Sequence, residues 1–375
     1  MFSSKPGTVV RITRDLPTYQ ELTVSVGGVE AKAIAYPQLT GAARVGDRVW
    51  LNTTAVDLNL GTGGYHFVQG IEGRQERVYT PPGHIMKLRY TPWQVAVAVV
   101  EEEGSVLHER IKGFTSLMGT PVVVGTLHSM IAPAVLAFHA ISPGRRVVYI
   151  MTDGAALPLS LSNLVRQLKA HGLLAQTITA GHAFGGDLET VNVYSGLVAA
   201  KTVAAADLII IAMGPGIVGT GTKYGFSGIE QAYILEAVAK LGGYPIAIPR
   251  ISFADPRPRH WGLSHHGQTV LGELTTTPVA LGLPRWDEDK RRVLARQFRE
   301  SGVSKHYLYE VEIPAVEALM AAYDLQVKTM GRSVREDPAF FEAAAGAGVL
   351  AAVYLSDGVQ TLPLWRGSEE DNEDR

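Results

Sequence analysis

Residues 1 to about 80 alternate short apolar-rich runs with turn residues. The runs are rich in Val, Thr, Tyr and Ile, and dipeptides such as Gly27-Gly28 and Gly46-Asp47 separate them. Several short strands at this spacing are typical of a small barrel or sandwich. Because neither proline of Pro81-Pro82 fits inside a helix or a central strand, we predict a small all-β domain over residues 1–83. The expected strands are Thr8–Thr13, Glu21–Val26, Glu30–Tyr36, Arg48–Thr54 and Tyr65–Gln69.

From about residue 94 the pattern changes to continuous apolar runs separated by segments of helical periodicity. Strands that are buried on both faces of a sheet need such runs. The alternation predicts an α/β fold with a mainly parallel, doubly wound sheet, which is a Rossmann-like domain over residues 84–285. The expected strands are Val95–Val100, Val122–Val124, Val147–Met151, Leu174–Thr179, Leu208–Ala212 and Pro245–Ile248.

Helix signals fill the gaps between these runs. Apolar residues at i, i+3, i+4 and i+7 begin at Leu161 and end before Gly172, and a similar series begins at Ile234. After Pro284 we expect a helical C-terminal region over residues 286–366 that packs on the α/β domain, with helices at 286–301, 314–325 and 338–355. The acidic tail 367–375 is expected to be disordered.

Composition and charge narrow the possible partners. Hydrophobic residues make up 46% of the 375 residues and charged residues 19%, which is enough for a sizeable core. The formal net charge of -2 gives no electrostatic signature of binding to nucleic acid or to an anionic membrane. The basic run Lys290-Arg291-Arg292 is balanced by neighbouring acids and is interpreted as a solvated helix face. The absence of cysteine excludes disulfides and thiolate ligands, and no metal-binding spacing occurs.

Neither the first residues nor the most apolar stretch predicts a targeting or membrane segment. The first residues lack the apolar core of a secretory signal. The uncharged run Phe114–Gly144 contains Pro121, Pro133 and Pro143, so it predicts a short buried strand, a loop and a helix instead of a membrane span. We therefore expect a soluble, cytoplasmic protein with no membrane or nucleic-acid partner.

A ligand site is expected where the parallel strands end, because βα loops and helix N-termini gather at that edge of the sheet. Five loops leaving this edge carry polar and ionisable residues. Alternatively, these are ordinary hydrophilic loops. They contain Thr126, His128 and Ser129; Thr152, Asp153 and Gly154; Gly181, His182, Gly185, Gly186 and Asp187; the segment from Gly214; and the segment from Arg250 through Asp255, Arg257 and Arg259 to His260.

The fourth loop, residues 214–228, is unusually rich in glycine: six of its fifteen residues are glycine, against 40 of 375 in the whole chain. Glycine lets successive N–H groups turn toward an anion. The loop also matches G-x-G-x-x-G, but the predicted helix starts near Ser227 instead of inside the motif, and no P-loop is present. We favour anion binding over a structural loop, and both over a dinucleotide site. The residues assigned to the anion are Gly214, Gly216, Gly219, Thr220, Gly221, Thr222 and Lys223.

Arginine and histidine follow the expected strand Pro245–Ile248 in the string RPRHWGLSHHG, residues 257–267. Arg257 and His265 are assigned to the same anion. For the adjacent pair His265-His266 a metal site is the weakest interpretation, because neighbouring side chains of a strand point to opposite faces. Acid–base or phosphate contact and a turn with satisfied hydrogen bonds remain open.

His128, Asp153 and His182 are the candidate catalytic residues, because they follow strand ends and histidine titrates near neutral pH. A structural role is the alternative for each histidine, and capping of the next helix is the alternative for Asp153. A serine-hydrolase elbow is excluded because the second glycine of G-x-S-x-G is missing after Ser227.

Three long strings carry a resemblance to a known family: NTTAVDLNLGTGGYHFV (52–68), TDGAALPL (152–159) and GPGIVGTGTKYGFSG (214–228). In these strings the chain resembles a bacterial family known as domain of unknown function 3866. The resemblance implies a soluble bacterial protein and supplies no catalytic residues. The first string is rich in Asn, Thr and Asp that cap turns, and a contact surface is its alternative role.

Together these patterns lead to one functional hypothesis and one rival. We expect an enzyme or enzyme-like protein that binds a small phosphorylated or carboxylated ligand at the carboxyl edge of the sheet. The rival is a non-catalytic protein that senses a small molecule through the same loops. No cofactor is indicated by the sequence.

Overall fold

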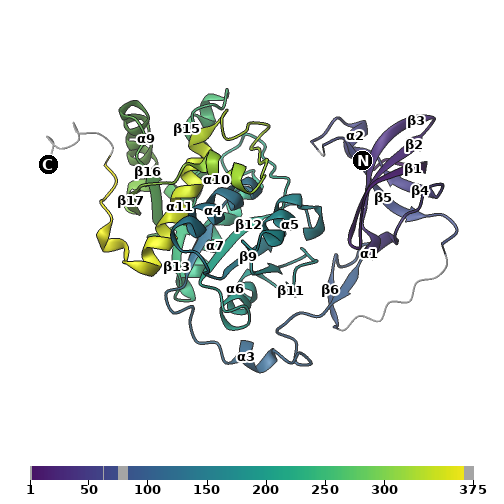
Figure 1. Ribbon diagram of the computed structural model, residues 1–375, viewed down its shortest axis with the longest axis horizontal. Coiled ribbons are helices and arrows are strands. Elements are labelled where there is room, and N and C mark those ends of the chain that lie inside the picture. Colours follow the sequence, from purple (N-terminus) through teal and green to yellow (C-terminus); the bar gives the residue numbers. More distant parts are fainter. Residues whose placement is uncertain (1, 62, 75–82, 367–375) are drawn as a thin grey trace. The chain divides into compact units, whose positions relative to one another are not determined.

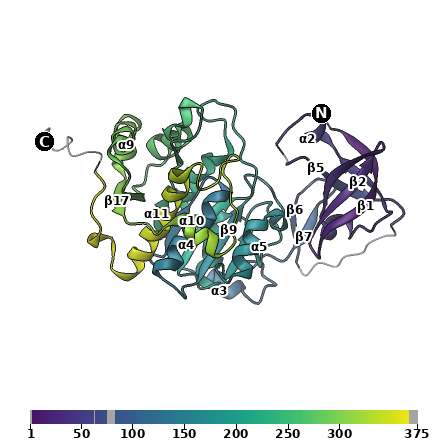
Figure 2. The same ribbon diagram turned by 45° about the horizontal axis from the view of Figure 1, so that its top comes forward.

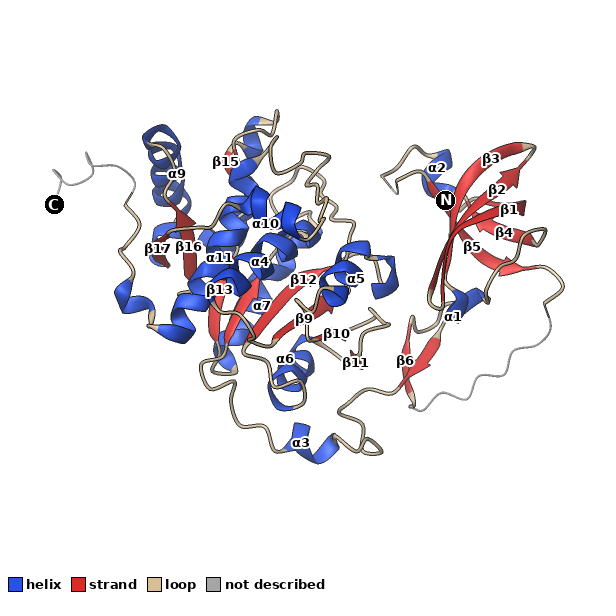
Figure 3. Cartoon of the chain, viewed as in Figure 1, coloured by secondary structure: helices blue, strands red, loops and turns tan. Residues whose placement is uncertain are grey.

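The computed structural model describes residues 2–61, 63–74 and 83–366. The chain divides into two compact units, Met1–Val97 and Ala98–Arg375 (Figure 1). The first is built on a barrel, and the second is an α/β unit in which helices lie against both faces of a sheet (Figures 2 and 3).

The five strands predicted in the N-terminal unit form a closed barrel in the order β1-β2-β3-β5-β4, which is the strand order of an OB-fold. Alternate residues such as Val9, Leu22, Val24 and Leu51 point inward and form its core, as period-2 patterning requires. The strands are β1 Ser4–Leu16, β2 Tyr19–Val26, β3 Val29–Ala35, β4 Arg48–Asn52 and β5 Tyr65–Ile71, and the short helices are α1 Pro37–Thr40 and α2 Thr54–Asp57.

The predicted strand Val95–Val100 is wrong in its partner and its length. Only Val95–Val97 is a strand, β7, and it pairs antiparallel with β6 (Ile85–Lys87) in the N-terminal unit. Residues 95–97 are only half-buried, so they lack the full burial that a central parallel strand needs, whereas Val99 is buried and forms an isolated parallel bridge to Glu189. The boundary between the units follows Val97, whereas the proposed boundary at Pro81-Pro82 lies outside the described residues.

An eight-stranded sheet forms the centre of the second unit, and every pair of neighbouring strands in it is parallel. This confirms the predicted parallel sheet and places the ends of β8, β9, β10 and β12 along one edge. Its order is β11-β10-β9-β12-β8-β13-β16-β17. The bounds are β8 Pro121–Val124, β9 Val147–Thr152, β10 Gln176–Thr179, β11 Leu188–Glu189, β12 Leu208–Met213, β13 Tyr244–Ala247, β16 Ala280–Pro284 and β17 Tyr307–Val311. Strand β17 lies in the segment that was expected to be helical.

Successive residues of the central strands supply two separate cores, one on each face of the sheet. Tyr149 and Met151 of β9 belong to one core, and Val148 and Ile150 belong to the other. Helices α4 Ile131–Ile141, α5 Asn163–Ala170, α10 Val316–Ala322 and α11 Pro338–Ser356 pack on the first face. Helices α6 Val193–Thr202, α7 Glu230–Lys240 and α9 Glu288–Ser301 pack on the second face. The short helix α3 spans His108–Lys112.

Helix α11 owes its position to small residues. An added Cβ at Gly348 would lie 2.1 Å from the carbonyl oxygen of Ala134 in α4, and one at Gly346 would lie 2.4 Å from that of Gly282 in β16. Glycine at these positions therefore lets the backbones touch. Among the described residues, α11 is the one helix long and apolar enough to cross a membrane, but most of it is buried against α4 and β16.

Between β13 and β16 the chain forms a compact insertion. Strands β14 (Ile251–Ser252) and β15 (Gly262–Leu263) pair antiparallel. They are followed by α8 (His265–Gly267), which continues into a π-helix over Gln268–Leu274. Isolated π-helical turns occur frequently at functional sites. This insertion places Arg250 and His265 in the wall of the same pocket.

Candidate functional site

The candidate site lies at the carboxyl edge of the sheet, beside the ends of β12 and β13. Strand β8 runs between these two and connects to α4 on one face, while β12 connects to α7 on the other face. Connections that leave neighbouring strands toward opposite faces open a crevice, which is where open α/β sheets bind ligands. A pocket of about 310 Å³ is present there.

The pocket has a basic lining. It contains three arginines and three histidines, and no acidic residue contributes to its wall. An anion is the ligand that such a wall attracts. The lining residues are Ile217, Val218, Gly219, Gly221, Arg250, Arg257, Arg259, His260, His265, His266 and Met330.

Four of the residues assigned from sequence to an anion line this pocket: Gly219, Gly221, Arg257 and His265. Gly221 has a φ of +78°, a backbone conformation that favours glycine. Gly219 lets the ring of His266 approach the main chain, because an added Cβ would lie 3.3 Å from Cε1 of that histidine.

The other residues assigned to the anion serve the loop itself. Lys223 forms an ion pair with Glu273, which also accepts a hydrogen bond from Tyr224. Thr220 and Thr222 hydrogen-bond to each other at 2.9 Å, and Thr220 donates to the carbonyl of Gly225. Gly214 packs against the carbonyl of Ala156, and Gly216 has a φ of +116°.

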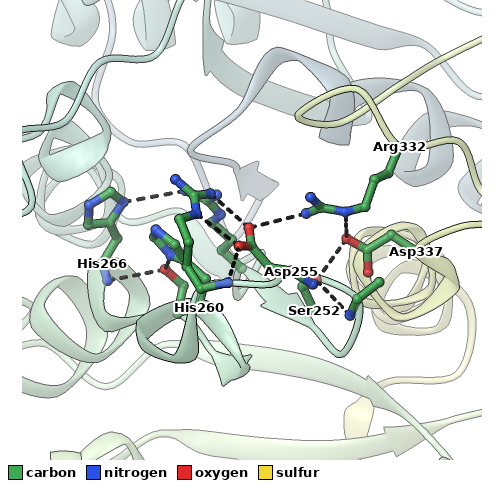
Figure 4. A network of polar contacts seen from close by, with 10 residues as sticks. Ser252, Asp255, His260, His266, Arg332 and Asp337 are labelled. Atoms are coloured by element: carbon green, nitrogen blue, oxygen red, sulfur yellow. Dashed lines mark hydrogen bonds and ion pairs between the residues drawn. The ribbon is translucent and has the colours of Figure 1, made fainter.

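A buried ionic network fixes one wall of the pocket (Figure 4). Asp255, whose side chain is 1% exposed, accepts two hydrogen bonds from the Arg257 guanidinium, at 2.9 and 2.8 Å. Arg332 donates to Asp255 at 3.2 Å and to Asp337 at 3.0 Å, and Ser252 donates to Asp337 at 2.8 Å. The hydrogen bonds from Arg257 are the main cause that holds the pKa of Asp255 below its usual range.

The network leaves excess positive charge in the pocket. Two arginines, Arg257 and Arg332, offset the two buried aspartates. Arg250 forms no ion pair with a described residue; it donates to Nδ1 of His266 at 3.4 Å. Burial lowers the pKa of Arg250 to about 10, so the guanidinium still carries its charge at neutral pH. Arg259 is exposed and makes no hydrogen bond or ion pair with any residue that the structure describes.

Three imidazoles lie side by side against these arginines. The ring centroids of His265 and His266 are 4.1 Å apart, and His260 lies 4.9 Å from the first and 5.3 Å from the second. His266 also stacks on Phe226 of the glycine-rich loop, with 3.9 Å between centroids. Burial is the main cause that lowers the pKa of His260 and His266 to about 3, so both are neutral at physiological pH.

Both ring nitrogens of His128 lie within hydrogen-bond distance of other groups of the protein. Its Nε2 lies 2.6 Å from Oγ of Ser162, and its Nδ1 lies 3.1 Å from the carbonyl oxygen of Met213. Ser162 is the N-cap of α5 and accepts from the N–H of Val165, so its hydroxyl is free to donate to the imidazole. Burial lowers the pKa of His128 to about 4. The ring of His128 thus joins the start of α5, through Nε2, to the end of β12, through Nδ1.

Asp153 and His182 meet through the main chain. The carboxylate of Asp153 accepts a hydrogen bond from the peptide N–H of His182 at 2.9 Å, which joins the loops that follow β9 and β10. Neither residue lines the basic pocket. Asp153 is thus held against the loop that carries His182, whereas the ring nitrogens of His128 contact Ser162 and Met213.

Several residues of the site were not identified from sequence. Met330, Arg332 and Asp337 come from the segment before α11, far along the chain from the loops that the topology indicated. A tight turn, Thr329–Arg332, carries Met330 and Arg332, and Asp337 is the N-cap residue of α11. The only sequence signal is Gly331, and a single glycine is too common in turns to mark a site. Glu230, at the first turn of α7, is a buried carboxyl that was also missed.

The fold and the pocket define an α/β protein with an N-terminal β-barrel and a basic pocket at the carboxyl edge of its parallel sheet. A family model described as "Protein of unknown function (DUF3866)" matches residues 32–348, so the chain belongs to that family. No curated protein matches the chain. Among the described residues, no group of three or more His, Cys, Asp or Glu side chains is placed to hold a metal ion.

Proposed function

We propose that the protein binds a small phosphorylated or carboxylated ligand in the basic pocket between the glycine-rich loop 214–228 and the insertion that follows β13. The observation that carries this proposal is the charge of the wall: Arg250, Arg257 and Arg259 line it, and no acidic residue does. Guanidinium groups bind carboxylate and phosphate oxygens through paired, charge-assisted hydrogen bonds. A pocket of about 310 Å³ fits a small molecule.

The backbone of the loop supports the same proposal. Gly219 and Gly221 form part of the wall without side chains that would cover it. Main-chain N–H groups of such a segment can add to the recognition of an anion. An enzyme and a sensor would share this pocket, and they differ in whether the ligand is consumed.

A titration with single-arginine variants tests the proposal. Thermal unfolding is followed with inorganic phosphate, sulfate, sugar phosphates and small carboxylates; a ligand at 100 times its Kd adds about 2.7 kcal/mol of stability. Arg259→Gln removes an exposed side chain with no partner among the described residues, so the variant should fold normally and bind roughly tenfold more weakly.

The matched control is Arg145→Gln. Arg145 is exposed, pairs with Asp207 and precedes β9, so it lies at the opposite, amino edge of the sheet. The Arg145→Gln variant should bind anions with the same Kd as the wild type. If no anion stabilises the wild type, or if both variants weaken binding equally, the pocket is not the site. Phosphorus NMR of a phosphorylated ligand that binds then distinguishes turnover from binding alone.

A further inference from the structure

The three imidazoles of the basic pocket differ in how their nitrogens are used. Nδ1 of His266 faces the guanidinium of Arg250, which can only donate, so this nitrogen has to accept and carry no proton. Nδ1 of His260 lies 2.7 Å from Oγ of Ser264. Nε2 of His265 is buried and has no hydrogen-bond partner among the described residues.

A buried polar atom without a partner is uncommon, because it loses its hydrogen bonds to water and gains nothing in return. In His265 that atom belongs to a residue of the pocket wall. A ligand oxygen is therefore the natural partner of Nε2, provided that the nitrogen carries a proton to donate.

The surroundings of His265 oppose that proton as long as no anion is bound. Burial is the main cause that lowers the pKa of His265, and the positive charges of Arg259, Arg250 and Arg257 add to the effect. On its own helix it faces the neutral ring of His266. Two acids of the same insertion are already paired: Asp255 with Arg257 and Arg332, and Glu273 of the π-helix with Lys223 of the glycine-rich loop. A doubly charged anion would reverse the sign of the local field.

We propose that the pocket takes up a divalent oxyanion, such as a phosphomonoester, together with one proton, and that Nε2 of His265 receives this proton and donates it in a hydrogen bond to the ligand. This inference rests on the proposed function and assigns its ligand a charge of two. The proton comes from solvent. Binding thus adds the dianion and one positive charge to a wall that already carries three guanidinium groups.

Sulfate is the probe for the test, because it stays a dianion from pH 6 to pH 8 and any proton taken up must be held by the protein. The dissociation constant of sulfate is measured by calorimetric titration of the full chain across this range. Between the pKa values of the free and the bound histidine, the Kd should fall about tenfold for each unit by which the pH is lowered, the limit for one proton. Titrations in buffers of different ionisation enthalpy count the protons directly.

His265→Gln keeps a hydrogen-bonding side chain but cannot gain charge. It should abolish the proton uptake and flatten the pH dependence of the sulfate Kd between pH 6 and pH 8. The matched control, His171→Gln, changes an exposed histidine that ends α5 at the amino edge of the sheet, and it should bind sulfate as the wild type does.

The outcomes separate this inference from the function on which it rests. Sulfate binding without proton uptake overturns the role of His265 and leaves the anion pocket standing. Proton uptake that persists in His265→Gln also overturns that role, because another group then holds the proton. Absence of sulfate binding at every pH overturns both.

Discussion

Glu230 carries a carboxyl group in a place that suits its neutral form better than its charged form. The residue is 3% exposed, accepts a hydrogen bond from Thr152 at 2.5 Å and lies near the negative charge of Asp153. Burial is the main cause that raises its pKa to about 7, and Asp153 adds to the effect. The protonated acid is therefore the form that folding favours.

The stability of the protein should depend on pH through this residue. A pKa raised on folding gives stability that is fully present below the unfolded pKa of 4.5 and is lost as the pH rises through about 7. Glu230→Gln should remove this dependence. Relative to the variant, the wild type should lose up to about 3 kcal/mol of unfolding free energy between pH 4.5 and pH 8, measured by denaturant titration.

Glu109→Gln is the matched control, because Glu109 is an exposed residue of α3. It should leave the pH dependence as in the wild type. A Glu230→Gln variant whose stability falls with rising pH as steeply as that of the wild type would show that the carboxylate is well solvated or paired in the folded state.

Single residues of the site could be predicted from sequence where they follow a strand of the parallel sheet along the chain. Arg257 and His265 follow a strand of the parallel sheet, so the rule about carboxyl ends finds them. The ion pair of Lys223 with Glu273 could not be predicted, because the two residues meet only after the π-helix has packed beside the loop. The same holds for Arg332, whose aspartate partners come from two different segments.

At the scale of elements, the close packing of α11 makes a prediction that opposes helix propensity. Alanine is favoured over glycine inside a helix by about 1 kcal/mol. At Gly348, however, a methyl group would lie 2.1 Å from the backbone oxygen of Ala134, so α11 would have to move away from α4. Gly348→Ala should therefore destabilise the protein by about 1–3 kcal/mol, measured by chemical unfolding.

Gly104→Ala is the control for that substitution. Gly104 is exposed, and an added Cβ would meet nothing within 4 Å. The change should alter the unfolding free energy by less than about 0.5 kcal/mol. A Gly348→Ala variant that is more stable than the wild type would contradict the close contact between α4 and α11.

Elements were predictable from sequence where burial is uniform along the strand. Every residue of β9 and β12 is buried, and their continuous apolar runs were recognised. Strand β17 was missed because it is an edge strand, half-buried along most of its length, between segments of helical pattern. Strand β16 was also missed, because it contains Gly282 and Pro284, residue types that normally mark turns.

At the scale of the molecule, the second unit should work without the first. All residues that line the pocket, and both cores of the parallel sheet, lie within residues 98–375. A fragment of these residues should unfold cooperatively and bind sulfate with the Kd of the full chain, within about twofold, measured by circular dichroism and calorimetric titration. A folded fragment that has lost sulfate binding would show that residues 1–97 contribute to the site.

The turn that carries Arg332 also sets the order in which the site can be assembled. Its partner Asp255 lies 77 residues earlier in the chain, and Ser252 lies 85 residues before Asp337. Contacts between such distant residues form late, because a long loop has to close first. During synthesis the strands and the glycine-rich loop emerge well before this turn. The pocket is therefore completed only when α11 docks, and a chain interrupted before Arg332 would carry all eight strands of the parallel sheet but no finished binding site.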